Sequence, residues 1–584
     1  MMTDKRMPGS AATIRQRAGR AIFLVGLAAL AFAAIVGLSG GVTLRFGSLA
    51  LPSGTPWRAL MVAAVAIASA RALLGGAAFT DAIARVKGPP SRRASRASVV
   101  LAFAAFVVAT AWNTRAAGGS DSSCYLLQAD AFAHGRATLA APLSELPPAL
   151  PPVALAPAGF VPSPKPPFEA VPICPPGLAL LMTPAVIVHR DAPFLVVPLF
   201  AALAVWLTFS LGRAWADDRV GIWSAVLLGC SPIFLYQAVQ PMSDVPAVAL
   251  TLGALVGASR GGRRGAILSG LCVSLAVLTR PNLAVLVPLL ALLLTNGDRS
   301  LLTLREKWDL SPFLWFAVAM APGAAVMLVL NAARYGAPLA SGYGDTGALF
   351  SWAHVAPNLA RYPRWLLETH SPALVLAIAA PVILWARGRV REALAGTLAI
   401  VAVVATYVFY TVFDDWWYIR FLLPVLPVIL IFAVITAWRI AASFSGARLA
   451  VPMGALLLAG WYLDVAHSRH ALRLQALESR FRAAGDYAAR DLPANAIVFA
   501  VQLSGSVRYH GERRAVAWDG IPGDALDETV AWLRARGDSP FIALEDEEEP
   551  VFRHRFVGER LGALERRPTA ELRGLVRVRF YEVP

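Results

Sequence analysis

Long apolar stretches separated by short polar segments fill the chain from its start to residue 466. A membrane-spanning helix needs about 20 apolar residues, or somewhat fewer when neighbouring helices shield it. We therefore predict about 13 membrane spans. They lie over 21–43, 59–79, 97–113, 193–212, 220–237, 243–258, 265–279, 282–295, 311–331, 371–386, 393–413, 421–438 and 450–466.

One further apolar stretch, 174–188, is shorter and is bracketed by prolines. It begins Cys174-Pro175-Pro176-Gly177. A stretch of this length is too short to cross a bilayer on its own. We expect it to form a helix that lies at the membrane surface.

The pattern changes after residue 466, where alternating apolar runs typical of strands are separated by polar stretches compatible with helices. The runs lie near 497–501, 541–544 and 576–581, and the polar stretches at 471–490 and 524–536. The segment 467–584 is long enough for one small domain. The pattern as a whole predicts an all-α polytopic membrane protein with a small C-terminal α/β soluble domain.

The composition agrees with a membrane protein. Hydrophobic residues make up 57% of the 584 residues and charged residues only 15%, whereas soluble domains have about 25% charged residues. These values exclude a soluble enzyme, a disordered chain and a fibrous protein. Four cysteines exclude a disulfide-built scaffold and a zinc site of ordinary cysteine spacing.

The net charge of +16 follows the predicted loops. If the N-terminus is cytoplasmic, the inner loops hold 23 Lys and Arg residues and the longer outer loops hold 10. This is the positive-inside pattern, so we expect residues 467–584 on the outer side. That segment carries 18 Arg and 18 acidic residues. The basic balance therefore records membrane orientation, and we expect a lipid bilayer and no nucleic acid as partner.

Acidic residues are few at the predicted outer face, which makes each a candidate for chemistry. Asp121 follows an outward span and the pair Gly118-Gly119, which allows a tight turn, and it precedes a helix-like segment. A carboxylate there could act on a polar acceptor while a lipid carrier reaches it from the bilayer. Asp121 could instead be only the N-cap of its helix. The other outer candidates include Asp244 at the mouth of a span, and Asp414 and Asp415 before a late span.

Several short motifs follow in a fixed order along the chain. They are an outward span ending in Asp121 with Tyr125 one turn on, Ala133-His134-Gly135, Pro175-Pro176-Gly177, Leu211-Gly212-Arg213, Ser231-Pro232, Gln240-Pro241-Met242-Ser243-Asp244, Leu278-Thr279-Arg280-Pro281, and Trp417-Tyr418-Ile419-Arg420 before Phe421-Leu422-Leu423-Pro424. Their order and topology resemble the family C glycosyltransferases, in particular the bacterial members akin to protein mannosyltransferases and the lipid A aminoarabinose transferase. The resemblance implies a catalytic membrane region over 97–466 with an outer loop at 114–173, extra spans over 1–96, and a periplasmic domain over 467–584.

The resemblance also implies an activity: inverting transfer of a hexosyl or pentosyl group from a polyprenyl-phosphate-sugar donor. The acceptor would be a lipid, a glycan or a protein at the periplasmic face of the bacterial inner membrane, with the N-terminus cytoplasmic. Such a reaction needs a base for the acceptor hydroxyl, and by resemblance Asp121 is that base. The family's protein mannosyltransferases carry Asp-Glu at this place, whereas here Ser122 follows Asp121. Asp121 can still act as the base, but this chain lacks the second acidic residue that a role for two adjacent acids would need.

The departing lipid phosphate needs cations, and the planar guanidinium suits phosphate. Arg280 and Arg420 lie at the outer ends of spans, where a membrane-embedded phosphate would sit, although each could instead only reach the interface. Asp244 could orient the acceptor or the sugar, or hold a divalent cation. No metal-ligand cluster is evident, and the sequence points to no other metal or cofactor. The remaining substrate-binding candidates are Tyr125, Asp414 and Asp415.

Two of the four cysteines, Cys124 and Cys174, fall on the outer side and bracket most of the first outer loop. An oxidising periplasm permits a disulfide between them. Such a bridge would fix the loop beside Asp121 to the Pro175-Pro176-Gly177 motif.

Three other classes of protein are alternatives: a polytopic transporter, an O-antigen polymerase or ligase, and a non-enzymatic membrane scaffold. A transporter is expected to carry ionisable residues in mid-span and matching halves. Here Arg71 is the clear mid-span charge and no halves match. For a polymerase or ligase we expect a large outer loop late in the chain, whereas here it is early and poor in Arg.

Overall fold

The fold was analysed in a computed structural model of the chain. The structure describes residues 91–295 and 310–583, apart from residues 144, 146, 167, 445 and 446. It also describes 42–46, 49–53, 56–87 and scattered positions between 18 and 33. Much of the predicted span 21–43 lies outside the described residues.

In the described part of the chain, six helices are long and apolar enough to cross a membrane. They are the segment Ala59–Phe79 of α2 (Pro56–Lys87), α3 (Ser91–Ala111), α6 (Val196–Trp215), α10 (Gly262–Thr279), α12 (Ser311–Tyr335) and α16 (Val390–Val408). Three further pairs of helices are each bent at a short break, and the number of candidate spans is up to nine if each pair is counted as one span. The protein is therefore a multi-pass membrane protein, as predicted, while the count of about 13 stays a prediction.

The predicted spans 243–258, 282–295 and 450–466 correspond to α9 (Asp244–Arg260), to the 3-10 helix η3 (Pro281–Leu286) with α11 (Val287–Thr295), and to α18 (Ala450–Ser468). The stretch 174–188 forms a helix as predicted, α5, Pro176–Val188, and its place at the membrane surface stays a prediction. It begins after Pro175, because a proline at the first turn of a helix loses no intrahelical hydrogen bond.

Prolines cause the three sharp bends. The pair α7 (Asp218–Cys230) and α8 (Pro232–Ala238) bends by 64°, and η6 (Trp416–Leu422) and α17 (Leu426–Ala442) by 84°. The helix Trp352–His370, which includes α14 (Val355–His370), bends by 109° into Pro372–Ala386, formed by η5 (Pro372–Ala379) and α15 (Ala380–Ala386). Proline cannot donate the backbone hydrogen bond that continues a helix, so the chain turns there.

A buried hydrogen bond joins two of these bends. The Oγ of Ser231, between α7 and α8, lies 2.8 Å from Nε2 of His370. The hydroxyl of Thr369 donates to the carbonyl of Trp365 at 2.7 Å and therefore accepts from Nδ1 of His370, at 2.8 Å. His370 thus fixes two bends to each other.

Glycines let α9 and α10 pack closely. A side-chain carbon on Gly257 would meet the backbone of Ser269, and one on Gly265 would meet the carbonyl of Gly257. Small residues at such contacts allow membrane helices to approach each other. Every position of α9 from Asp244 to Ala258 is buried. The start of α9, with Asp244, is therefore held in the interior of the bundle.

The C-terminal segment contains a five-stranded sheet of order β6-β5-β7-β9-β8. Its strands are β5 (Ala496–Phe499), β6 (Arg514–Val516), β7 (Ser539–Glu545), β8 (Ala570–Leu572) and β9 (Val578–Glu582). Strand β5 pairs parallel with β6 and β7, whereas β9 pairs antiparallel with β7 and β8. The main helices are α19 (Leu474–Asp491), α20 (Ser504–Tyr509), α21 (Leu526–Ala535) and α22 (Glu548–Arg555). The predicted α/β class is confirmed.

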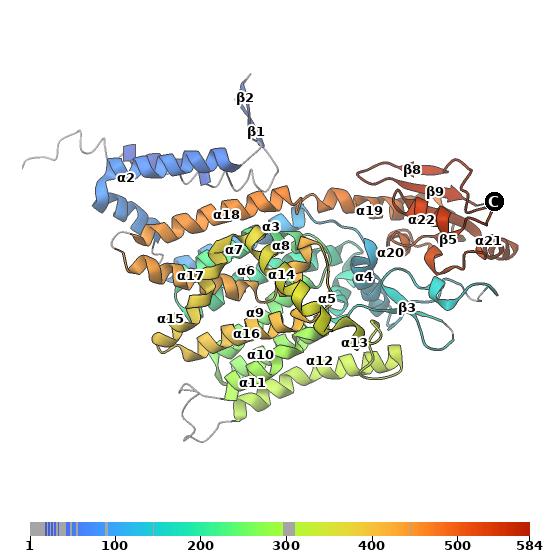
Figure 1. Ribbon diagram of the computed structural model, residues 1–584, viewed down its shortest axis with the longest axis horizontal. Coiled ribbons are helices and arrows are strands. Elements are labelled where there is room, and N and C mark those ends of the chain that lie inside the picture. The colour runs from blue at the N-terminus through green and yellow to red at the C-terminus, as the bar shows by residue number, and fades with distance from the viewer. Residues whose placement is uncertain are drawn as a thin grey trace, which may run out of the picture.

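The first outer loop is packed into this C-terminal segment. Leu143, Leu150, Ala154 and Leu155 are buried in the same cluster as Ile497 of β5 and other residues on one side of the sheet. The backbone N–H of Ala517 donates to the carbonyl of Ala154 at 2.7 Å. Figure 1 shows α18 leading into α19, with the red C-terminal elements at one end of the helical bundle and α4 beside α20.

Candidate active site at the start of α4

Helix α4, Gly119–Ala133, carries Asp121 in its first turn. The N-cap is Gly118, without a side-chain cap, so the alternative that Asp121 is the N-cap is wrong. Gly119 has a φ of 55°, a conformation that favours glycine and turns the chain sharply into the helix. The Asp121 side chain is 43% exposed. Its carboxylate is therefore open to a second reactant.

Four of the predicted charged residues form two ion pairs. Nη2 of Arg420 lies 3.3 Å from Oδ2 of Asp121, and Nη2 of Arg280 lies 2.6 Å from Oδ1 of Asp244. The two guanidinium groups lie near the same ring, that of Phe421, at 5.8 Å for Arg280 and 5.5 Å for Arg420. Residues from four separate parts of the chain therefore meet in one place.

Tyr125 links the two ion pairs. It lies one turn after Asp121 on α4, and its hydroxyl donates to Oγ of Ser243 at 3.0 Å. The same Oγ accepts from Nε of Arg280 at 3.4 Å. Burial raises the pKa of Tyr125, and the negative charges of Asp121 and Asp244 raise it further. Tyr125 therefore stays protonated and keeps its hydrogen bond.

Several polar atoms at this place have no hydrogen-bond partner within the described part of the chain. They are Oδ2 of Asp244, Nη1 of Arg280 and Nε of Arg420. Buried polar atoms are normally paired, and exceptions are frequent at functional sites. Two cations with unused donors suit a phosphate, which offers several acceptor oxygens.

Asp244 and Asp121 have different environments. Asp244 is fully buried, whereas Asp121 is partly exposed. The buried carboxylate compensates the charge of Arg280 and fixes its direction. Of the two, Asp121 is the one that an acceptor could reach.

The structure does not bring Asp414 and Asp415 into this cluster. Both are exposed, and Asp414 forms an ion pair with Arg361. Asp415 lies just before η6, and its backbone carbonyl accepts from the N–H of Tyr418 at 3.1 Å. Neither contacts the two ion pairs described above.

Aromatic residues around Arg420 were missed at the level of sequence. Phe421 stacks on Tyr407 with ring centres 4.9 Å apart, and Tyr418 stacks on Phe413 at 3.8 Å. Arg420 lies 5.5 Å from the ring of Tyr418 as well. The run from Trp416 to Phe421 was a visible signal, but aromatic residues at this depth also serve as interface anchors.

Cys124 and Cys174 form a disulfide in the structure, with their Cα atoms 6.3 Å apart. The bridge joins α4 to the segment that leads into α5. Gln128 strengthens this connection, because its Nε2 donates to the carbonyl of Cys174 at 3.3 Å. Nη2 of the buried Arg334 in turn donates to Oε1 of Gln128 at 3.2 Å. The helix that carries Asp121 is thus fixed along its length.

A divalent cation has little support among the residues that the structure describes. They contain no group of three or more His, Cys, Asp or Glu side chains that could hold a metal. Asp121 and Asp244 are each paired with an arginine, which would compete with a cation for the carboxylate.

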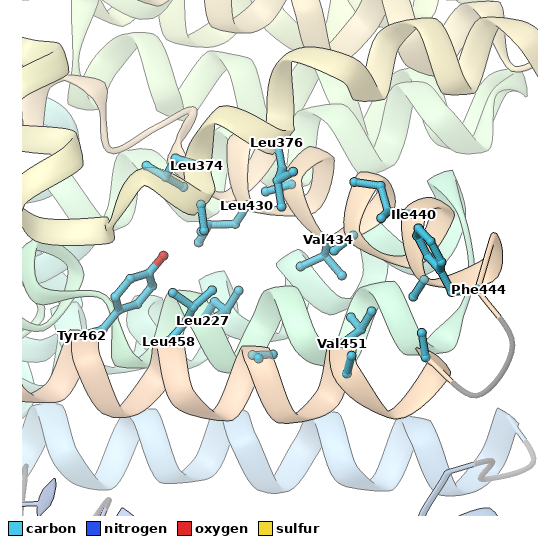
Figure 2. A pocket seen from close by; sticks show the side chains of 18 residues that line it. Leu227, Leu374, Leu376, Leu430, Val434, Ile440, Phe444, Val451, Leu458 and Tyr462 are labelled. Atoms are coloured by element: carbon cyan, nitrogen blue, oxygen red, sulfur yellow. The ribbon is translucent and has the colours of Figure 1, made fainter.

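An apolar cavity of about 410 Å³ lies apart from the charged cluster. Figure 2 shows its lining by side chains of α7, η5, α17 and α18, with Tyr462 near one end and Phe444 near the other. Tyr462 is the one titratable side chain in the lining. The cavity therefore offers a hydrocarbon-like space and no acid–base chemistry.

Part of the chain is similar to a known protein family. Residues 174–327 match the family described as dolichyl-phosphate-mannose-protein mannosyltransferase. This segment runs from Cys174 through Asp244 and Arg280 into α12. No curated protein matches the sequence.

Similar solved structures include ArnT from Cupriavidus metallidurans bound to undecaprenyl phosphate, at 14% identity and a TM-score of 0.48, covering 83% of this chain and 97% of that one. The apo form of that protein has 13% identity and a TM-score of 0.49, with the same coverage. The apo oligosaccharyltransferase of Archaeoglobus fulgidus has 11% identity and a TM-score of 0.43, covering 78% of this chain and 71% of that one. The family match confirms, over residues 174–327, the predicted resemblance to the family C glycosyltransferases.

Proposed function

We propose that the protein transfers a sugar from a polyprenyl-phosphate donor to a hydroxyl-bearing acceptor, with inversion, and that Asp121 is the general base. The observation that carries the proposal is the meeting of an exposed carboxylate, Asp121, with the guanidinium groups of Arg420 and Arg280. The match of residues 174–327 to a sugar-transferring family supports the same reaction class.

The proposed step breaks one bond and forms another. Asp121 removes the proton of the acceptor hydroxyl, and the oxygen attacks the anomeric carbon from the side opposite to the phosphate. The bond between that carbon and the phosphate oxygen breaks, and polyprenyl phosphate leaves with the electron pair. Arg280 and Arg420 stabilise the charge that develops on the phosphate.

The ion pair between Arg420 and Asp121 connects donor binding to the base. The guanidinium of Arg420 holds the carboxylate of Asp121 in this pair at 3.3 Å. A donor phosphate competes with Asp121 for the guanidinium of Arg420. Donor binding would therefore free the carboxylate at the moment when the acceptor hydroxyl must be deprotonated.

Asp244 has a supporting role in this proposal. Because it is fully buried and paired at 2.6 Å, it holds Arg280 charged and oriented and does not contact the acceptor. We place the reaction at the periplasmic face of a bacterial inner membrane, with a cytoplasmic N-terminus. The positive-inside pattern of the loops supports this orientation.

The experiment is a comparison of glycolipid and glycoprotein profiles in a strain that lacks the gene. The strain is complemented with the wild type, with Asp121→Asn, or with Asp130→Asn as a matched control on the same helix. We expect at least one sugar-modified product to return with the wild type and with Asp130→Asn, and to stay absent with Asp121→Asn. A product that returns with Asp121→Asn would remove the assignment of the base.

A further inference from the structure

We propose that the segment 467–584 positions the catalytic carboxylate by holding the chain at the start of α4, with His510 as the main positioning residue. This inference rests on the proposed function, because it takes Asp121 as the base. It gives the C-terminal domain a role in the reaction itself.

A hydrogen bond from His510 reaches the backbone just before α4. Nε2 of His510 accepts from the backbone N–H of Ala117 at 3.1 Å, four residues before Asp121. The His510 side chain is 8% exposed and stacks on Phe194, with ring centres 6.1 Å apart. The imidazole is therefore fixed, and it fixes the Ala117 amide.

Two other contacts from the same segment reach the first turn of α4. Gly505 of α20 packs so closely on Ser123 that a side-chain carbon at position 505 would clash with it. Glu478 and Phe481 of α19 lie equally close to Gly118, the N-cap. Small residues at 118 and 505 are what allow the domain to approach the helix.

The preceding residue, Ala116, belongs to the core of the C-terminal segment. It is 1% exposed and is buried in the same cluster as Phe481, Ala484 and Val507. The chain thus passes through the core of the domain immediately before it enters the catalytic helix. A rigid-body shift of the domain would carry the first turn of α4 with it.

Such a shift matters because the Asp121 carboxylate is held by one contact of 3.3 Å to Arg420. A displacement of about 1 Å at a reacting group can cost on the order of a hundredfold in rate. The rest of α4 is fixed separately by the Cys124–Cys174 disulfide and by Tyr125. Loosening the first turn should therefore impair the base and leave the phosphate-binding arginines in place.

The chemistry of His510 supplies a matched pair of variants. Because Nε2 accepts a hydrogen bond, the neutral ring carries its proton on Nδ1. His510→Leu removes the acceptor and fills the space with an apolar side chain. His510→Gln places an amide oxygen at a similar distance from the N–H of Ala117. Gly505→Ala disturbs the same contact from the other side with the His510 bond intact.

The test uses the full-length protein in detergent with three measurements. They are hydrogen–deuterium exchange of the amides at 117–123, the affinity for undecaprenyl phosphate as a probe, and kcat for the donor that the wild type turns over. For His510→Leu we expect at least tenfold faster exchange, at least tenfold lower kcat and an affinity unchanged within twofold. For His510→Gln we expect values close to the wild type, and for Gly505→Ala a change in the direction of His510→Leu.

Three results would overturn the inference. One is a His510→Leu protein with kcat within twofold of the wild type, and another is a loss of kcat without faster exchange at 117–123. The third is a His510→Gln protein as impaired as His510→Leu. If His510→Leu does not fold, Gly505→Ala decides by the same criteria. Full activity of Asp121→Asn would instead contradict the proposed function, and the exchange data would distinguish the two failures.

Discussion

Arg420 contacts Asp121 through Nη2, while its Nε has no partner among the described residues. A bound phosphate could accept from both Nε and Nη2, which lie on one edge of the guanidinium. The ammonium of a lysine does not offer two donors in this fixed arrangement. We expect Arg420→Ala to lower kcat/KM for the donor by about ten- to a hundredfold, through a higher KM, a lower kcat or both. We expect Arg420→Lys to restore only part of this loss. Steady-state kinetics with varied donor concentration measure both. Arg361→Ala, which removes a cation paired with the exposed Asp414, is the control and should behave as the wild type.

Motif order predicted which residues meet, but not all of them. Asp121, Tyr125, Asp244, Arg280 and Arg420 come together in the structure. Tyr125 was named because it lies one turn after Asp121, and the other four from their places at the ends of spans. Asp414 and Asp415 were named for the same reason but stay at the surface. Position at a span end fixes depth in the membrane, whereas the direction of a side chain depends on the turn that follows, here the 84° bend after η6.

At the scale of elements, the disulfide is a restraint on α4, the helix that carries Asp121. It closes a loop with a sequence separation of 50. Loop-closure entropy of that size corresponds to about 4 kcal/mol in the chain-entropy account. We expect Cys124→Ala/Cys174→Ala to unfold at a lower temperature and to lose activity, and the wild type to respond to reductant in the same direction. Thermal unfolding in detergent with and without reductant measures this, and Cys230→Ala/Cys272→Ala, which removes the two free thiols, is the control. Equal melting temperatures for the wild type and the bridge variant would contradict it.

His510 predicts an acid-dependent loss of stability in the C-terminal domain. Burial lowers its pKa to about 3, and the positive charges of Arg482 and Arg190 contribute, against Asp191. The unfolded state then binds the proton below about pH 6.5 and the folded state does not, so stability falls as pH falls from about 6.5 towards 3. We expect His510→Gln to lose about 2 kcal/mol less than the wild type between pH 8 and pH 5. Unfolding measured at both pH values checks the difference, and an identical loss in both proteins would show that His510 does not titrate in this way.

Hydropathy predicted the helices and alternation predicted the strands, but neither predicted the bends. The runs near 497–501, 541–544 and 576–581 correspond to β5, β7 and β9. The turn at Pro232 interrupts a stretch that reads as ordinary apolar sequence, the predicted span 220–237. A hydropathy window carries no information on direction, so a helix bent by 64° gives the same signal as a straight one.

At the scale of the molecule, the orientation of the bundle follows from the charged loops. We expect an alkaline phosphatase fusion after residue 584 to be active, because the C-terminal segment would lie in the periplasm, and a fusion after Gly261 to be inactive. Gly261 lies between α9 and α10, in a predicted inner loop with Arg260, Arg263 and Arg264. Enzyme activity in intact cells, normalised to expression, reports the side. An active fusion after Gly261 with an inactive fusion after residue 584 would show that the C-terminal segment lies on the cytoplasmic side, which contradicts the prediction.

The docking of the C-terminal domain on α4 is the feature that sequence reasoning could not reach. It joins residues 117–123 to residues 478–510, far along the chain, through a backbone amide and two glycines. Contacts of this kind leave no periodic pattern, and the glycines alone are indistinguishable from turn residues. The pattern of residues 467–584 predicted the α/β class of the domain but not which of its surfaces packs on α4.

The central claim is that Asp121 takes the proton of the acceptor. Its most direct test is the rate of sugar transfer by purified Asp121→Asn beside Asp130→Asn, with undecaprenyl phosphate affinity measured on the same samples. Removal of a general base costs about a hundred- to ten-thousandfold. We predict a loss of that size in kcat for Asp121→Asn, with undecaprenyl phosphate still bound and with Asp130→Asn close to the wild type. An Asp121→Asn protein that transfers sugar at the wild-type rate would contradict the account.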